Sequence, residues 1–166
     1  MAQKDSPPWQ YYDDSASGYD QLHGEEQRRK TQAIISIVKP EPDWKVIDIG
    51  CGTGVSMEGW PCKIRGIEPS QEMAASACGK GLDVTIAPAE SLPFPDNSFD
   101  LAIAVTSAHH FKPGAFKEMA RVAKLAAITL LAKSDIGRIR RDVEKHWTIR
   151  LESDCHPDVI WICDRR

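Results

Sequence analysis

The fold of this chain is decided by the stretch Val46-Ile47-Asp48-Ile49-Gly50-Cys51-Gly52-Thr53-Gly54. An apolar run with one embedded acid stops there at three glycines, each separated from the next by a single residue. Such a pattern is typical of a buried strand whose carboxyl end lets a ligand approach the main chain. A helix that starts directly after the turn would offer free N–H groups and a partial positive charge to an anionic group. The stretch therefore predicts a ligand site in an α/β domain.

The spacing of the glycines separates two classes of nucleotide-binding protein. A dinucleotide-binding protein is expected to carry Gly-x-Gly-x-x-Gly, but the third residue after Gly52 is Val55. With Asp48 before the glycines and Glu68 further along, the stretch instead resembles the first motif of class I S-adenosylmethionine-dependent methyltransferases. A tight turn in some other α/β protein is the alternative interpretation.

The resemblance implies a small, type 11-like member of that family. Its fold would be a Rossmann-like three-layer α/β sandwich, with a seven-stranded, mostly parallel sheet that ends in an antiparallel hairpin. The cofactor it implies is S-adenosylmethionine, with S-adenosylhomocysteine as the product.

Length and composition favour a single domain in the cytoplasm. A chain of 166 residues can bury roughly 70% of its unfolded surface, which is enough for one full core. We expect residues 1–9 to be flexible, residues 10–42 to form cover helices and residues 45–166 to form the core. The net charge of −3 predicts no bulk affinity for nucleic acid. No apolar run approaches the roughly 20 residues that span a bilayer, so we expect no membrane contact.

The cysteines indicate no metal or disulfide chemistry. All five lack a Cys-x-x-Cys partner, so neither a zinc site nor a disulfide framework is predicted. Cys51 stands inside the glycine stretch, where we expect a small apolar filler at the cofactor site rather than a nucleophile.

Aromatic residues gather near the start of the chain, at Trp9, Tyr11, Tyr12 and Tyr19. The sequence from Tyr12-Asp13-Asp14 to Tyr19-Asp20 resembles the opening of many small methyltransferases, where an aromatic residue folds over the methionine end of the cofactor. The resemblance assigns Tyr19 to the cofactor site. The alternative is that these rings only pack the first helix, expected over residues 25–38, onto the sheet.

Glu68 follows a strand expected over residues 63–67, and ligands of open α/β sheets bind outside such strand ends. A carboxylate there can accept charge-assisted hydrogen bonds from both hydroxyls of a ribose. The context Gly66-Ile67-Glu68-Pro69-Ser70 resembles the second motif of the family, which implies that Pro69 and Met73 flank the adenine. A solvated surface acid is the alternative interpretation of Glu68. Ser70 is expected to cap a helix that runs to about Cys78.

The segment from Ala89 to Asp100 also resembles the family, but its start departs from the family pattern. Where many members carry Gly-Asp, with the acid accepting from the adenine amino group, this chain has Ala87-Pro88. Proline supplies neither an acceptor side chain nor an N–H donor. We therefore assign Ala89 and Glu90 to the adenine side, with Glu90 or a backbone carbonyl replacing the missing acid.

Ser107, His109 and His110 follow an apolar strand expected over residues 99–106. In the resembled fold this strand end faces the sulfonium of the cofactor, so Ser107 is assigned to the cofactor site. We expect His109 or His110 to act as a general base, with a purely structural role as the alternative. The family's Asn/Asp-Pro-Pro-aromatic run is absent, which argues against an amino group of a DNA base as the acceptor.

The last third of the chain predicts the remaining elements. Helices are expected over 113–124 and 136–146, and strands over 126–131, 147–152 and 159–164, the last two forming a hairpin. The Pro-Gly-Gly that usually precedes the fifth strand is missing. No lid insertion follows that strand, so we expect an open site that suits a larger substrate or a protein partner that closes it.

Together these inferences predict a methyltransferase whose acceptor the sequence does not name. Two alternatives stay open: a non-catalytic cofactor-binding subunit that regulates a partner protein, and a nicotinamide-dependent dehydrogenase. The residues assigned to the cofactor are Tyr19, Asp48, Gly50, Cys51, Gly52, Gly54, Glu68, Pro69, Met73, Ala89, Glu90 and Ser107.

Overall fold

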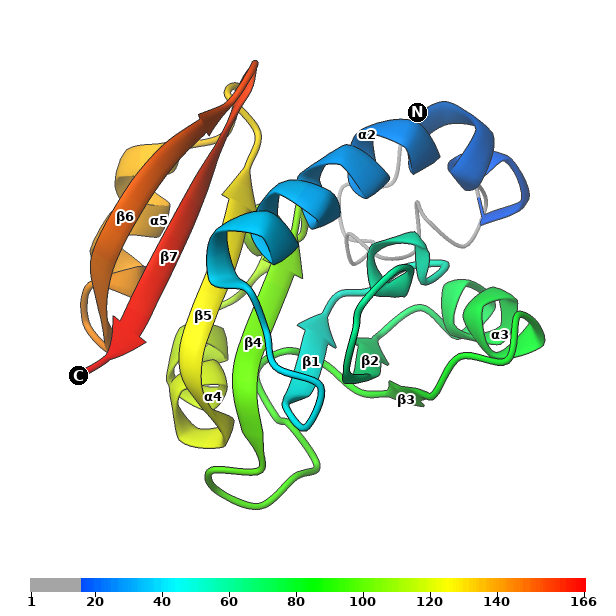
Figure 1. Ribbon diagram of the computed structural model, residues 1–166, viewed down its shortest axis with the longest axis horizontal. Helices are drawn as coiled ribbons and strands as arrows, with labels where there is room; N and C mark the ends of the chain where they lie inside the picture. The colour runs from blue at the N-terminus through cyan, green and yellow to red at the C-terminus, as the bar shows by residue number, and fades with distance from the viewer. Residues whose placement is uncertain (1–15) are drawn as a thin grey trace, which may run out of the picture.

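The computed structural model describes residues 16–166 and shows one sheet with helices on both faces (Figure 1). In chain order the elements are α2 (Ala16–Val38), β1 (Lys45–Ile49), η1 (Val55–Met57), β2 (Lys63–Glu68), α3 (Gln71–Gly79), β3 (Val84–Ile86), β4 (Phe99–Val105), η2 (Ala108–His110), α4 (Ala115–Val122), β5 (Ala123–Leu130), α5 (Ile136–Val143), β6 (Trp147–Cys155) and β7 (Asp158–Arg165). No helix within these residues is long and apolar enough to cross a membrane.

In the described part of the chain the strands form a seven-stranded sheet of order β3-β2-β1-β4-β5-β7-β6. The first five strands pair in parallel, and β7 runs antiparallel between β5 and β6. The order reverses at β1, because β2 lies on one side of it and β4 on the other. Ligands of open α/β sheets bind at such a reversal, so the topology places a site beyond the carboxyl ends of β1, β2 and β4. The predicted fold class is confirmed.

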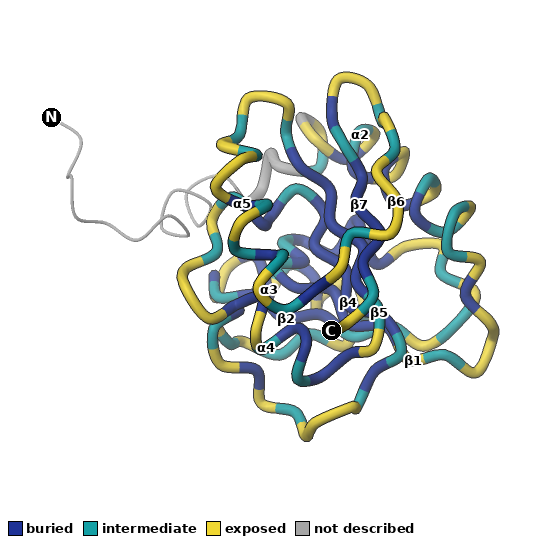
Figure 2. The backbone as a smooth tube through the Cα atoms, turned by 90° about the vertical axis from the view of Figure 1, so that its left-hand side faces the viewer, coloured by how far each residue is buried: buried dark blue, intermediate teal, exposed yellow. Residues whose placement is uncertain are grey.

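Two apolar layers hold the sheet between its helices, and Figure 2 shows the buried positions concentrated along the central strands. On one face Ile34 of α2 packs with Val46, Leu101 and Ile103. On the other face Met119 of α4 and Ile139 of α5 join the side chains of alternate strand positions. Because helices cover both faces of the sheet, nearly every residue of β4 is buried, and its sequence is an almost continuous apolar run.

Several element boundaries differ from the predicted ones. The first helix begins at Ala16 rather than near residue 25, and the segment after the glycines is only the 3-10 turn η1. The predicted helices over 113–124 and 136–146 are shorter, and β6 extends to Cys155. Strand β5 starts at Ala123 because that residue, the C-cap of α4, is already extended, with φ −131° and ψ 157°. This explains how the chain dispenses with Pro-Gly-Gly.

Arg121 on α4 fixes the long connection between β3 and β4. Its guanidinium donates to the carbonyl oxygens of Leu92 (2.9 Å) and Phe94 (2.7 Å) and to Asp96 Oδ1 (2.9 Å). It also donates from Nε and Nη2 to the carboxylate of Glu118, at 2.8 Å each, and Glu118 in turn accepts from the Leu92 N–H at 2.9 Å. These acceptors need several N–H donors that lie in one plane. Among the side chains, only the guanidinium of arginine provides such donors.

We expect Arg121→Lys to lower the free energy of unfolding by about 1–3 kcal/mol, because one ammonium group cannot serve these acceptors. Urea unfolding followed by circular dichroism measures the change. The matched control is Arg150→Lys, whose ion pair with Asp164 is exposed and whose replacement should cost no more than about 0.5 kcal/mol. Equal losses in the two variants would contradict this role for Arg121.

Candidate functional site

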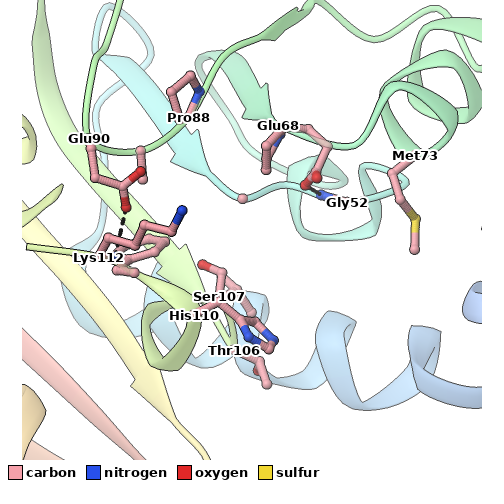
Figure 3. Close-up of a pocket in the computed structure, with 14 residues that line it drawn as sticks. Gly52, Glu68, Met73, Pro88, Glu90, Thr106, Ser107, His110 and Lys112 are labelled. Atoms are coloured by element: carbon pink, nitrogen blue, oxygen red, sulfur yellow. Dashed lines mark hydrogen bonds between the residues drawn. The ribbon is translucent and has the colours of Figure 1, made fainter. Parts of the chain in front are cut away.

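A cavity opens at the carboxyl edge of the sheet, where the order of strands reverses (Figure 3). Its walls come from the glycine turn after β1, the end of β2, the start of α3, and the segments that follow β3 and β4. The lining residues are Gly50, Gly52, Glu68, Pro69, Met73, Pro88, Ala89, Glu90, Val105, Thr106, Ser107, His110, Phe111 and Lys112.

The glycine turn needs glycine for reasons of geometry. Gly50 and Gly52 have φ of 76° and 57°, in the left-handed region that residues with side chains rarely adopt. A Cβ on Gly50 would also lie 2.7 Å from Cβ of Ser107, well inside contact distance. The turn is fastened to β2, because the N–H groups of Gly50 and Cys51 donate to the Ile67 carbonyl at 2.7 and 3.0 Å. Backbone without side chains therefore forms this wall of the cavity.

Glu68 lies at the end of β2, only 7% exposed, with its carboxylate held by two backbone N–H groups. Gly52 N–H donates to Oε2 at 2.8 Å, and Ser70 N–H donates to Oε1 at 2.9 Å. A carboxylate oxygen can accept more than one hydrogen bond, and Glu68 lines the cavity. The main chain thus fixes the orientation of this acid before any ligand arrives, and Figure 3 shows it beside Gly52.

Asp48 does not line the cavity, because it is completely buried beneath the glycine turn. Ser56 Oγ donates to its Oδ2, while Oδ1 has no hydrogen-bond partner among the described residues. Burial, opposed by the Ser56 hydrogen bond and reinforced by the charge of Glu68, raises the pKa of Asp48 to about 7. Near neutral pH this acid is therefore close to half protonated.

Apolar residues form part of the cavity wall. Met73 and Ala89 are buried, Pro69 is half-buried and Pro88 is exposed. Glu90 Oε1 accepts from the backbone N–H of Lys112 at 2.7 Å, which ties the segment after β3 to the segment after η2. Figure 3 shows this hydrogen bond at the edge of the cavity.

The two histidines have different positions. His110 lines the cavity, whereas His109 does not, although the two ring centroids are only 3.9 Å apart. Burial, reinforced by electrostatic repulsion from nearby basic groups, lowers the pKa of His109 to about 4; these groups are His110, Lys133, Lys30 and Arg138. Burial also lowers the pKa of His110. At neutral pH both imidazoles are uncharged and carry one nitrogen that can accept a proton.

The cavity brings together most, but not all, of the residues assigned from sequence. Cys51 and Gly54 are buried behind it, as Asp48 is, and the side chain of Tyr19 lies outside the described residues, as do Trp9, Tyr11 and Tyr12. Sequence reasoning missed Val105, Thr106, Phe111 and Lys112 as lining residues. Their position directly around the end of an apolar strand was the available signal. No group of three His, Cys, Asp or Glu side chains in residues 16–166 comes together in a way that could hold a metal ion.

Comparison with known proteins identifies a family. The model of a methyltransferase domain family matches residues 47–130, which include the glycine turn, Glu68 and both histidines. The uncharacterized protein MJ1252 of Methanocaldococcus jannaschii is 34% identical over 134 residues, covering 79% of this chain and 53% of that protein. The uncharacterized methyltransferase YcgJ of Bacillus subtilis is 33% identical over 103 residues, covering 55% of this chain and 41% of YcgJ. The chain spans about half the length of the curated relatives that it matches.

Solved structures agree with this result. The crystal structure of YcgJ superposes with a TM-score of 0.60 at 27% identity, covering 68% of this chain and 54% of YcgJ. A chain from the complex of the Haloferax volcanii Trm112 methyltransferase activator with a methyltransferase superposes with a TM-score of 0.74, covering 92% of this chain and 96% of that one. At 14% identity, the second similarity concerns the fold alone.

We expect the buried charge of Asp48 to make stability depend on pH. Its pKa is about 7 in the folded protein and 3.8 without the fold, so the folded protein binds the extra proton between these values. The contribution of Asp48 to the free energy of unfolding therefore falls as the pH rises from about 4 to about 7, and the loss is complete above that range.

Asp48→Asn removes the charge and should leave the protein more stable than wild type by roughly 2–4 kcal/mol near pH 8, with a much smaller difference near pH 4. Urea unfolding at the two pH values measures this, with Asp43→Asn as an exposed control. A difference that is the same at both pH values would show that Asp48 does not titrate between them.

Proposed function

Because the chain belongs to the methyltransferase domain family, we propose that it binds S-adenosylmethionine at the carboxyl edge of the sheet and transfers the methyl group to an acceptor. The observation that carries the proposal is Glu68, whose carboxylate is oriented toward the cavity by the N–H groups of Gly52 and Ser70. An acid fixed in this way, beside a turn without side chains, suits a ribose and the group attached to it.

The lining residues fit the parts of this cofactor in order. Glu68 would accept from the two ribose hydroxyls, and the glycine turn would face the methionine moiety. Pro69, Met73, Pro88 and Ala89 offer apolar surface to the flat adenine ring. Glu90 could accept from the adenine amino group with its second carboxylate oxygen. It would thus take over the role of the acid that many family members carry at the position of Pro88.

When bound, the cofactor supplies a methyl group that its sulfonium already activates. The protein then mainly has to hold the acceptor atom in line with that group, which is a matter of position and exclusion of water. An acceptor that must lose a proton also needs a base, and His110 lines the cavity with a neutral ring. His109 is less suited to this task, since it lies off the cavity and its low pKa makes it a weak base.

A second candidate function is a cofactor-binding subunit that regulates a partner protein without catalysis. The reduction of the first core helix to η1 and the proline at the adenine side favour it. The short connection between β5 and α5, residues 131–135, leaves no insertion that could cover the cavity, which favours a large acceptor or a protein that closes the site.

Localisation in the cytoplasm also stays a proposal, which fractionation of cells expressing the tagged chain would check.

The test of catalysis is methyl transfer from labelled S-adenosylmethionine into fractionated cell extract, with small molecules, RNA and protein kept apart. Label in one fraction identifies the class of acceptor. Cofactor binding in calorimetry without transfer into any fraction would favour the regulatory subunit instead.

Glu68→Ala should weaken cofactor binding by about 1.5–3 kcal/mol for each charged hydrogen bond lost, which is about 10-fold or more in Kd. Isothermal titration calorimetry with S-adenosylmethionine measures the change. Glu72→Ala provides a control of equal charge, because Glu72 is exposed in the first turn of α3 and lies off the cavity. An unchanged Kd in Glu68→Ala would remove the ribose assignment.

If the acceptor loses a proton, His110→Ala should lower turnover by about 10²- to 10⁴-fold and leave the cofactor Kd nearly unchanged, because a general base acts in the transition state. Since the pKa of His110 lies below 6.5, the wild-type rate should fall only on the acid side of that value, where the ring is protonated. A pH–rate profile with the acceptor found in the screen checks this. The acid limb should vanish in His110→Ala and persist in His109→Ala; a profile unchanged in both variants would exclude a histidine base.

A further inference from the structure

Lys30 on α2 is a charged side chain in the interior, with 1% of its surface exposed. Its Nζ lies 2.5 Å from Asp158 Oδ2 at the start of β7 and 2.5 Å from Glu26 Oε1 on the same helix. The third partner is the hydroxyl of Thr106, which accepts at 2.9 Å. Glu26 and Thr106 accept hydrogen bonds from the Lys30 ammonium group, and Asp158 forms an ion pair with it. A buried ion pair is weak evidence for stability, because apolar residues of the same volume often do as well. The presence of this lysine therefore calls for another explanation.

Thr106 is the residue in this cluster that reaches the cavity (Figure 3). It follows the last residue of β4 and has φ of 60°, which is rare for a residue branched at Cβ. Such a conformation persists only when the surroundings enforce it, and it is found most often at functional sites. Two groups hold Thr106: its N–H donates to Thr129 Oγ1 at 2.8 Å, and its hydroxyl accepts from Lys30.

The conformation of Thr106 sets the course of the chain along one side of the cavity. The next residue, Ser107, donates from Oγ to the Ile49 carbonyl at 2.6 Å and thereby meets the glycine turn. The turn η2 with His110 follows immediately, and then Phe111 and Lys112. A change at Thr106 would therefore redirect every lining residue that comes after β4.

The partners of Lys30 are themselves fixed in place. Asp158, the first residue of β7, accepts from the Ala132 N–H at 2.9 Å with its other oxygen. Because Ala132 follows β5, the strand that pairs with β7, this hydrogen bond fixes the Asp158 side chain beside both strands. The beginning of α2 is anchored as well, because Asp20 accepts from Thr53 Oγ1 in the glycine turn and from Lys80 Nζ. Helix α2 thus contacts the glycine turn through Asp20 and the segment after β4 through Lys30.

We propose that Lys30 is a positioning residue for methyl transfer, which holds Thr106 in its left-handed conformation and so fixes the acceptor side of the cavity, residues 106–112. The role in transfer rests on the proposed function, whereas the effect on Thr106 can be measured without any substrate. Lys30 acts through Thr106 and does not itself line the cavity.

The test compares wild type with Lys30→Met by amide hydrogen exchange resolved by NMR. The Thr106 amide should exchange at least about 10-fold faster in the variant, after correction for the change in global stability, because its segment opens locally. Ile139→Ala is the matched control: Ile139 is fully buried on the opposite face of the sheet, so its truncation lowers global stability without touching Lys30. Equal exchange of Thr106 in the two variants, after this correction, would overturn the proposal.

A second variant guards against failure of Lys30→Met to fold. Lys30→Met combined with Asp158→Asn leaves no uncompensated charge in the interior and keeps an oxygen for the Ala132 N–H. The same local increase in exchange at Thr106 is expected. If the Thr106 amide exchanges as slowly in the double variant as in wild type, the proposal is also overturned. Thr106 would then keep its conformation without the Lys30 ammonium group and without the Asp158 carboxylate.

Kinetics complete the test once an acceptor is known. Turnover should fall by at least about 10-fold in Lys30→Met, while the Kd for S-adenosylmethionine stays within about 3-fold, because the hydrogen bonds that hold Glu68 and fasten the glycine turn to β2 involve neither Lys30 nor Thr106. Glu26→Gln should keep near wild-type turnover, since Glu26 is the half-exposed partner and the contacts with Asp158 and Thr106 persist. Loss of cofactor affinity equal to the loss of turnover would overturn the positioning role. Failure of wild type to bind the cofactor would instead overturn the proposed function, and the two results are distinguishable.

Discussion

The structure depends on one constraint: the chain must turn beside the ends of three adjacent strands without placing a side chain between them. Gly50 meets this constraint with φ of 76° and a Cβ position that Ser107 already occupies. The hydrogen bonds that Gly50 and Cys51 donate to Ile67 fasten the turn to β2. The Ser107 hydroxyl bonded to Ile49 fastens β4 to β1. The carboxyl edge of the sheet is therefore rigid at the point where a ligand has to approach the backbone.

The carboxyl edge of the sheet differs from the apolar layers because charged side chains are buried near it. Asp48 and Lys30 are both almost without exposed surface, yet they are treated differently. Lys30 forms ion pairs with Glu26 and Asp158 and donates to Thr106, while Asp48 accepts from the hydroxyl of Ser56 and has one oxygen without a hydrogen-bond partner among the described residues. Burial therefore leaves the lysine paired and raises the pKa of the aspartate to about 7. Both side chains lie next to backbone segments that line the cavity. The unfavourable free energy of burying these two charged groups therefore arises beside the site.

The helices contribute to the site through a few polar contacts as well as through packing. Arg121 of α4 holds the segment that carries Ala89 and Glu90, and α2 holds the segment that carries Thr106 and Ser107. Between them, Glu90 accepts from the Lys112 N–H and joins the two segments. The cavity is thus framed by loops whose positions are set from helices on opposite faces of the sheet. This arrangement compensates for the reduction of the first core helix to the short turn η1.

The sequence by itself determined the approximate positions of most strands along the chain, the glycine turn and the place of Glu68 at a strand end, because each rests on local chemistry: apolar periodicity, residues that tolerate positive φ, and an acid after an apolar run. It also indicated the end of β4 as part of the site. Only the tertiary structure decided that Asp48 is buried behind the turn, that His110 and not His109 reaches the cavity, and that Lys30 meets Thr106 across the fold. These facts depend on contacts between residues far apart in the chain, and no spacing or propensity along the sequence specifies which side chain meets which.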